Sequence, residues 1–305
     1  MSIKIRRNFQ ERKVEKWTGF IYILPWLLGF SIFQLYPFIA TFGYSFTNYT
    51  LLNVPSFTGF KNYIRLFTTD FLFQKSMQIT GMYTLMAVPG KIVLALIVAM
   101  LLSSQIKGIK LYRSLYYLPS ILGGSVAVSV LWRVLFMRDG MVNQIIGIVG
   151  IPPLDWLTSP NLALLTLSLL QVWQFGSAMV IFLAALKQIP KEIFEAAEVD
   201  GASKIRRVFS ITIPQISSVI FFNLIMQTIQ SLQNFTSAFV ITNGGPMRKT
   251  YIIGMKLYDD AFKNYNVGYA CAESWILFVV ILLLTACIFK SSDAWVYYAD
   301  EGERK

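Results

Sequence analysis

The chain has 305 residues, of which 55% are hydrophobic and only 14% are charged, and its mean hydropathy is +0.55. Because soluble domains carry about 25% charged residues, this composition indicates a membrane protein. The chain has 2 cysteines and no histidine, which excludes a His/Cys zinc site and a Ser-His-Asp triad.

The first elements are a basic N-terminal tail over residues 1–16 and an apolar run over residues 17–46. This run is longer than the ~7–15 apolar residues of a signal peptide, and it lacks an Ala-x-Ala cleavage site. We interpret it as an uncleaved first transmembrane span that is kinked near Pro25 or Pro37.

Five further apolar segments follow, and each is long enough to cross a ~30 Å hydrocarbon core with about 20 helical residues. They cover residues 79–103, 111–137, 162–186, 215–241 and 268–289. Their apolar residues are continuous rather than alternating, so each is expected to be a helix. The predicted fold class is an all-α polytopic membrane protein, with six transmembrane helices in a domain over residues 17–290 and a tail over 291–305.

The formal net charge of +11 has two possible explanations, contact with nucleic acid or anchoring of the spans by basic residues. Lysine and arginine are concentrated in alternate connections, namely the N-terminal tail, residues 104–113, residues 187–214 and the C-terminal tail. Because basic residues collect on the cytoplasmic side of membrane proteins, these segments and both termini are expected in the cytoplasm. Topology therefore explains the charge, and no nucleic-acid partner is expected.

The connection between the fourth and fifth spans is dense in charge and carries helix signals. Pro190 suits the first position of a helix and Gly201 suits the cap after its end. Ser203 is a candidate N-cap for a second short helix that ends near Ile211, before Pro214 begins the fifth span. The residues by themselves leave two interpretations open, a helix that lies on the membrane surface and a docking element for a partner.

The same connection carries a motif made of Glu195, Ala196, Ala197, Asp200, Gly201, Ile211 and Pro214. The spacing Glu-Ala-Ala, three residues, Gly, nine residues, Ile and then Pro resembles the signature loop of permease subunits from binding-protein-dependent ABC importers. Asp-Gly-Ala at residues 200–202 resembles this part of the motif in the carbohydrate importers. Examples are the first-type permeases of maltose, glycerol-3-phosphate and multiple-sugar systems. Ile213 stands where the family usually has leucine.

This resemblance, which extends over about residues 17–290, implies a type I importer permease fold and a set of partners. The loop over residues 190–214 would form a coupling helix that docks on a cytoplasmic ATPase, with Glu195 at the contact and Gly201 allowing the turn. ATP and Mg²⁺ would bind two partner ATPase subunits, while this chain would bind no metal or cofactor and would not be an enzyme. A second homologous permease, an extracytoplasmic sugar-binding protein and a sugar substrate, an oligosaccharide in particular, complete the expected partners in the cytoplasmic membrane of a bacterium or archaeon.

The fifth predicted span is the most polar of the six. Its amide side chains recur at i, i+4, i+7 and i+11, on one helical face: Asn223, Gln227, Gln230 and Asn234. Because unpaired amides in lipid are costly, this face is expected to point into the protein, either to bond neighbouring helices or to line a path for sugar hydroxyls. In the fourth span Gln174 is assigned to the same candidate path, and Trp173 is expected to stack on a sugar ring or to pack.

Two charged residues within the predicted spans are further candidates, Lys91 in the second span and Glu273 in the sixth. Ionisable groups inside a membrane are functional candidates by default, so both are assigned to the substrate path, although they could also pair with each other. If the substrate is an acidic sugar, Lys91 is the residue expected to contact it.

Two other classes of function remain as alternatives. A self-contained secondary transporter would usually show inverted repeats and more than six spans, and it has no use for the 190–214 motif. A membrane-embedded enzyme would need paired intramembrane carboxylates or a nucleophile motif, and the sequence has neither.

Overall fold

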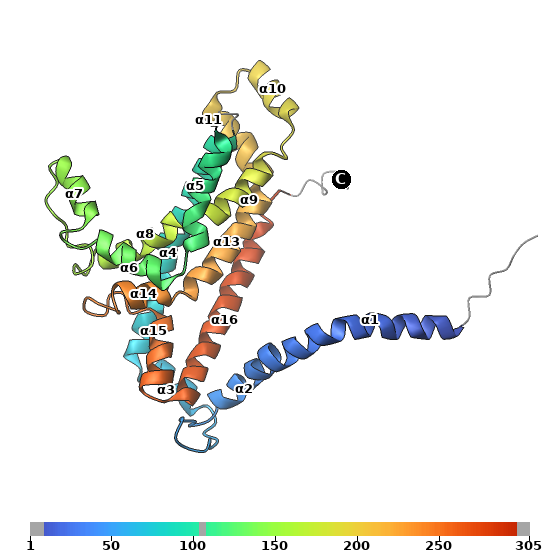
Figure 1. Ribbon diagram of the computed structural model, residues 1–305, viewed down its shortest axis with the longest axis vertical. Helices are drawn as coiled ribbons and strands as arrows, with labels where there is room; N and C mark the ends of the chain where they lie inside the picture. Colours follow the sequence, from blue (N-terminus) through green and yellow to red (C-terminus); the bar gives the residue numbers. More distant parts are fainter. Residues whose placement is uncertain (1–8, 104–107, 298–305) are drawn as a thin grey trace, which may run out of the picture. The chain divides into compact units, whose positions relative to one another are not determined.

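The computed structural model describes residues 9–103 and 108–297, so the ends of the two predicted tails lie outside the described residues (Figure 1). The described helices are α1 (Phe9–Phe30), α2 (Tyr36–Ser45), α3 (Lys61–Thr68), α4 (Phe71–Ser103), α5 (Ile109–Leu122), α6 (Val126–Leu135), α7 (Met141–Ile148), α8 (Ala163–Trp173), α9 (Gly176–Leu186), α10 (Lys191–Val199), α11 (Lys204–Arg207), α12 (Ile213–Gln215), α13 (Ser217–Leu232), α14 (Thr236–Ile241), α15 (Ile253–Tyr258) and α16 (Val267–Ser292). Three π-helical turns join some of them, at Ser31–Leu35, Val208–Thr212 and Asp259–Lys263.

The chain divides into two compact units. The first consists of Met1–Arg65 and Asp260–Trp275, and the second consists of Leu66–Asp259 and Ile276–Lys305. This division follows packing rather than the predicted boundaries after residues 16 and 290, and α1 already begins inside the predicted N-terminal tail.

Six candidate spans are present in the described part of the chain if each bent helix pair counts as one span. Three are single helices over Phe20–Ser45, Phe71–Ser103 and Val267–Ser292. The others are the pairs α5 with α6, α8 with α9, and Lys204–Gln215 with α13, bent by 105°, 44° and 70°. The predicted number of spans agrees with this count, whereas the expectation of continuous helices is wrong for the third, fourth and fifth spans.

In the first unit the irregularity of the first span lies near Pro37 rather than Pro25. The α-helix α1 runs through Pro25, and the π-helical turn Ser31–Leu35 comes directly before α2. Proline has no N–H, so Pro37 cannot donate the hydrogen bond that a regular helix would direct to Phe33. The backbone ladder is therefore interrupted at this turn, as is common for π-helical turns within helices.

In the second unit α4 is the central helix and packs against α8, α9, α13 and α15. Its small residues Ala95 and Ala99 are completely buried, together with Met179 and Phe182 of α9. Lipid tails are as apolar as the helix side chains, so the hydrophobic effect does not drive helices together in a membrane. Close van der Waals packing at small residues is instead a main source of their association energy. A helix that is surrounded in this way can carry polar side chains away from lipid.

The break between α5 and α6 follows from three consecutive residues. Gly124 has φ +76°, a left-handed conformation that glycine adopts without strain and that commonly ends a helix. Ser125 then caps α6, because its side-chain oxygen accepts a hydrogen bond from the Val128 amide at 3.3 Å. The Gly-Gly-Ser sequence at 123–125 thus carries both a stop and a start signal within one apolar segment.

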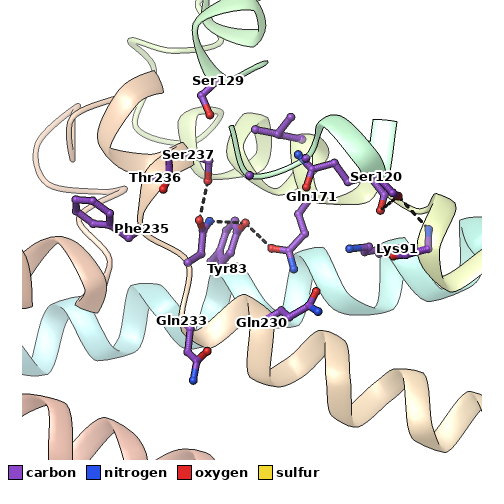
Figure 2. A pocket seen from close by; sticks show the side chains of 16 residues that line it. Tyr83, Lys91, Ser120, Ser129, Gln171, Gln230, Gln233, Phe235, Thr236 and Ser237 are labelled. Atoms are coloured by element: carbon purple, nitrogen blue, oxygen red, sulfur yellow. Dashed lines mark hydrogen bonds between the residues drawn. The ribbon is translucent and has the colours of Figure 1, made fainter. Parts of the chain in front are cut away.

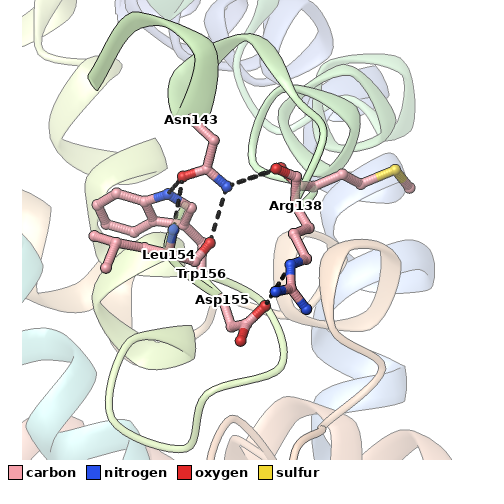
Figure 3. A network of polar contacts seen from close by, with 6 residues as sticks. Arg138, Asn143, Leu154, Asp155 and Trp156 are labelled. Atoms are coloured by element: carbon pink, nitrogen blue, oxygen red, sulfur yellow. Dashed lines mark hydrogen bonds and ion pairs between the residues drawn. The ribbon is translucent and has the colours of Figure 1, made fainter. Parts of the chain in front are cut away.

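The connection over residues 138–161, between the third and fourth predicted spans, contains helix α7 (Figure 3). The buried Asn143 of α7 donates hydrogen bonds to the carbonyls of Arg138 and Leu154, each at 2.9 Å. Its side-chain oxygen accepts from the Leu154 amide at 3.0 Å and from Trp156 Nε1 at 2.9 Å. One fully bonded amide therefore holds both ends of this loop, while the exposed Arg138–Asp155 pair at 3.9 Å contributes little.

The connection over residues 242–267, between the fifth and sixth predicted spans, also contains a packed helix. Helix α15 lies against α4, and its Lys256 is buried where Nζ pairs with Asp70 Oδ2 at 2.9 Å. The other oxygen of Asp70 accepts a hydrogen bond from the Phe73 amide at 2.8 Å and so caps the start of α4. Lys256 is therefore part of a buried ion pair, although it lies in a connection between two predicted spans.

Candidate functional site

The second unit contains a polar cavity of about 510 Å³ (Figure 2). Five amide side chains and six hydroxyl groups line it, together with one cation: Gln171, Gln174, Gln230, Gln233, Asn234, Tyr83, Ser120, Ser129, Ser177, Thr236, Ser237 and Lys91. The remaining lining residues are Gly123, Gly124, Leu170 and Phe235. Such a concentration of neutral hydrogen-bonding groups among apolar helices is typical of a ligand-binding site.

The polar lining gathers at the helix breaks. Gly123 and Gly124 separate α5 from α6, Gln174 follows the last residue of α8, and residues 233–235 separate α13 from α14. A broken helix leaves backbone groups without partners, and inside a membrane protein this is tolerated where the break lines a polar cavity. The three breaks therefore explain why polar residues from different spans converge at one place.

A close contact between α5 and α9 fixes two of these breaks to each other. The Ser120 hydroxyl donates to the Gln174 carbonyl at 2.9 Å and accepts from the Ser177 amide at 3.0 Å, so it satisfies two backbone groups freed by the break. A Cβ atom at Gly176 would lie 2.5 Å from the Tyr116 carbonyl oxygen, so only glycine allows this approach. The geometry of the cavity wall thus depends on one serine and one glycine.

A hydrogen-bonded chain connects three spans beside the cavity (Figure 2). Tyr83 of α4 donates to Gln171 Oε1 of α8 at 2.5 Å and accepts from Asn234 Nδ2 at 2.7 Å. Ser237 donates to Asn234 Oδ1 at 2.9 Å. These side chains are hydrogen-bonded to one another, whereas the Gln230 side chain makes no hydrogen bond to another described residue.

Replacing Tyr83 with phenylalanine is expected to lower the stability of the protein by about 1 kcal/mol, because it leaves polar atoms of Gln171 and Asn234 without their partner. Thermal unfolding of the purified protein measures the effect. Tyr112→Phe is the matched control, since the Tyr112 ring is about half exposed and makes no hydrogen bond through its hydroxyl among the described residues. Equal melting temperatures for the two variants would show that the chain of hydrogen bonds contributes nothing.

The structure brings four of the predicted path residues to this cavity, Gln174, Gln230, Asn234 and Lys91. The other four do not line it: Asn223, Gln227, Trp173 and Glu273. The predicted polar face divides within α13, between Gln227 and Gln230, and Asn234 lies beyond the end of this helix at Leu232.

The four residues outside the cavity have other surroundings. Asn223 and Gln227 are buried in the packed part of α13, and the Asn223 amide donates to the Val219 carbonyl of its own helix at 3.0 Å. Trp173 lies 5.7 Å from the Trp132 ring and lines a separate, apolar pocket. Glu273 is completely buried within α16 and belongs to the first unit. Their assignment to a substrate path stays a prediction.

Several residues that line the cavity were not predicted from the sequence, above all Tyr83, Ser120 and Ser237. Single hydroxyl residues within apolar runs are usual in membrane helices, where they often bond to their own backbone. The only local signal is that Ser120 lies next to the Gly-Gly break at 123–124, and no signal in the sequence distinguishes Tyr83. Their roles depend on partners that are distant in the sequence.

The signature loop forms α10 and α11 at the end of the second unit opposite α15 (Figure 1). The Gly201 amide donates to the Glu198 carbonyl and the Ala202 amide to the Ala197 carbonyl, with Gly201 at φ +74°, which is a Schellman motif. Ser203 Oγ accepts from the Arg206 amide at 3.3 Å. The predicted caps at Gly201 and Ser203 are therefore confirmed.

Two details of this loop differ from the prediction. Pro190 is the N-cap residue, one position before the first residue of α10, and its extended ψ of 137° keeps it outside the helix. Pro214 lies in the short helix α12, and the fifth span proper begins at Ser217 after a bend of 70°. Proline cannot donate a backbone hydrogen bond, which favours an irregular turn here rather than a regular helix start.

The loop presents an open surface. Helix α10 has no buried residue, and Glu195, Ala196 and Asp200 are exposed. Large apolar side chains are exposed beside them, with 89% of Val199 and 73% of Ile205 accessible. Charged and apolar groups presented together on a capped, ordered helix are typical of a protein interface.

Comparison with known proteins identifies the chain. A family model described as the inner membrane component of binding-protein-dependent transport systems matches residues 79–305. The chain belongs to this family.

Three relatives cover nearly the whole chain. The probable ABC transporter permease protein YesP of Bacillus subtilis is 43% identical over 289 residues, 94% of each chain. The multiple sugar-binding transport system permease protein MsmF of Streptococcus mutans is 33% identical over 92% of this chain and 97% of its own. The lactose transport system permease protein LacF of Rhizobium radiobacter is 32% identical over 88% and 91%.

A solved structure has the same fold. It is the crystal structure of a bacterial ABC transporter involved in the import of the acidic polysaccharide alginate, and its chain matches with a TM-score of 0.78 at 20% identity. The match covers 94% of this chain and 99% of the other. The protein is thus a multi-pass permease subunit of an ABC importer, and the alternatives of a membrane-embedded enzyme and a self-contained secondary transporter are removed.

Proposed function

We propose that this permease carries a saccharide, an oligosaccharide in particular, through the polar cavity of its second unit. The observation that supports this proposal is the cavity of about 510 Å³, whose lining consists mostly of residues with amide and hydroxyl groups. Sugar hydroxyls both donate and accept hydrogen bonds, and amide side chains match them in both roles. The relatives MsmF and LacF, which are named for sugar and lactose transport, support the same substrate class.

The loop over residues 190–214 is proposed to couple this cavity to ATP hydrolysis. Glu195 and the exposed apolar side chains around it would dock on one of two cytoplasmic ATPase subunits, which bind ATP and Mg²⁺. The exposure of α10 and its rigid cap at Gly201 support this role. Closure of the ATPases would then move the permease between inward-open and outward-open states.

The proposed assembly also contains a second homologous permease and an extracytoplasmic binding protein that delivers the sugar. The concentration of basic residues in the tails and in residues 187–214 supports a cytoplasmic location for both termini and for this loop. The loops at the opposite end of the spans would then face the binding protein.

Reconstitution of the complete assembly in liposomes tests the proposal. We expect a labelled oligosaccharide to accumulate only when ATP is enclosed with the ATPases and the binding protein is present outside. Uptake without ATP would contradict coupling to an ATPase. ATP-dependent uptake of other solutes, with no uptake of any saccharide, would contradict the substrate class.

A further inference from the structure

The cavity contains a charge that a neutral sugar does not need. Lys91 lies in the middle of α4, 12 residues before its end at Ser103 and therefore about 18 Å along the helix from that end. The residue is only 4% exposed, so its side chain is largely buried within the protein. A cation at such a depth is costly in a membrane protein and commonly marks a functional site.

No described residue neutralises this cation. Among the described residues, Lys91 makes neither an ion pair nor a hydrogen bond. Its side chain lines the cavity, as Figure 2 shows, and none of the described lining residues carries a carboxylate. The cavity therefore holds one positive charge without a counter-charge from its own walls.

The structure around Lys91 holds it at this wall. Its neighbour Gly90 allows α8 to approach, because a Cβ atom there would lie 3.0 Å from Val172 Cγ2. Ser120, the lining hydroxyl that bridges α5 and α9, is already engaged with the backbone at Gln174 and Ser177. A neutral hydroxyl ligand would leave the ammonium group poorly compensated, whereas an anionic group would pair with it directly.

We propose that the cavity accepts an acidic saccharide with one carboxylate near Lys91, and that Lys91 is the residue that selects for the acid. This inference rests on the proposed saccharide transport and names its substrate class. A single lysine balances a carboxylate, which carries one negative charge, better than a phosphate ester, which carries about 1.5 to 2. The free amide of Gln230 would then bind hydroxyl groups of the same ligand.

The test uses the complete assembly in liposomes with two matched disaccharides. One contains a single uronic-acid unit, and the other is its neutral analogue in which the carboxylate is reduced to a hydroxymethyl group. The unmodified transporter is expected to favour the acid by roughly tenfold or more, the typical contribution of a charge-assisted hydrogen bond. A hexose phosphate is the third probe, and stronger competition by it than by the uronic acid would overturn the assignment to a carboxylate.

Variants test whether the preference for the acidic disaccharide depends on Lys91. Lys91→Met is expected to lower the ratio of acid to neutral uptake about tenfold, and Lys91→Arg, which keeps the charge, to retain most of it. Lys75→Met removes a lysine from an exposed position of the same helix and should leave the ratio unchanged. An equal loss of both substrates in Lys91→Met would make Lys91 structural and overturn the proposal.

The unmodified transporter keeps the proposal falsifiable even if Lys91→Met does not assemble. A preference for the neutral disaccharide would sink the inference while leaving saccharide transport intact. Absence of ATP-dependent uptake for both disaccharides and for other oligosaccharides would instead contradict the proposed function itself.

Discussion

Glu195→Lys is expected to reduce ATP-dependent uptake about a hundredfold or more while the protein remains in the membrane. Glu195 is exposed on α10, a helix without buried residues, so the substitution disturbs nothing within the chain. At the proposed ATPase contact it replaces a carboxylate by a cation, and disrupting a buried ion pair costs about 3–5 kcal/mol. Uptake and ATP hydrolysis are both measured in the reconstituted assembly, to determine whether the variant uncouples transport from hydrolysis.

The matched control for this prediction lies on the same helix. Glu192→Lys makes the same change of charge at another exposed position, in the first turn of α10, and lies outside the signature motif. It is expected to retain most of the uptake, with a small loss of helix stability from the dipole, about 0.3–1 kcal/mol. Full uptake by Glu195→Lys, or an equal loss in the two variants, would contradict the assignment of Glu195.

Asp70→Asn is expected to destabilise the protein by about 3 kcal/mol. Asparagine keeps the side-chain oxygen that accepts from the Phe73 amide, so the cap of α4 is retained and only the charge is lost. The Lys256 ammonium group, with its side chain 5% exposed, then loses the carboxylate that pairs with it at 2.9 Å. Thermal and denaturant unfolding of the purified protein measure the change in the free energy of unfolding.

Two further variants make this prediction specific. Asp155→Asn removes the acid of the exposed Arg138 pair at 3.9 Å and should change stability by less than about 0.5 kcal/mol. The double variant of Asp70→Asn with Lys256→Met should recover part of the lost stability, because the buried charge is removed as well. If Asp70→Asn is as stable as Asp155→Asn, the buried pair has no energetic role.

The sequence predicts the elements whose signals are local. Continuous apolar segments predict six spans, because a helix that crosses the hydrocarbon core must be mostly apolar over about 20 residues. The caps of the signature loop were predictable for a similar reason. The hydrogen bonds of the caps at Gly201 and Ser203 join residues three to five positions apart, so their chemistry is visible in the sequence itself.

The helix breaks were less predictable. The pair Gly123-Gly124 carries a stop signal, but the segment around it is apolar enough to be interpreted as one span. At Gln174 the sequence has no strong breaker except Gly176, and what stabilises the break is the distant Ser120 hydroxyl. A break within a span is favourable only when another helix satisfies the freed backbone groups, and that information is not local.

The sequence by itself therefore determined the membrane class, the number of spans, the capped signature loop and the family, because each depends on composition or on short spacings. The tertiary structure alone decided which polar residues share a cavity. Asn223 and Asn234 lie on one predicted helical face, yet one is packed against its own helix and the other bonds to Tyr83. The physical reason is that the end of α13 and the packing of α4, α8 and α9 set the direction of each side chain, and these contacts join residues far apart in the chain.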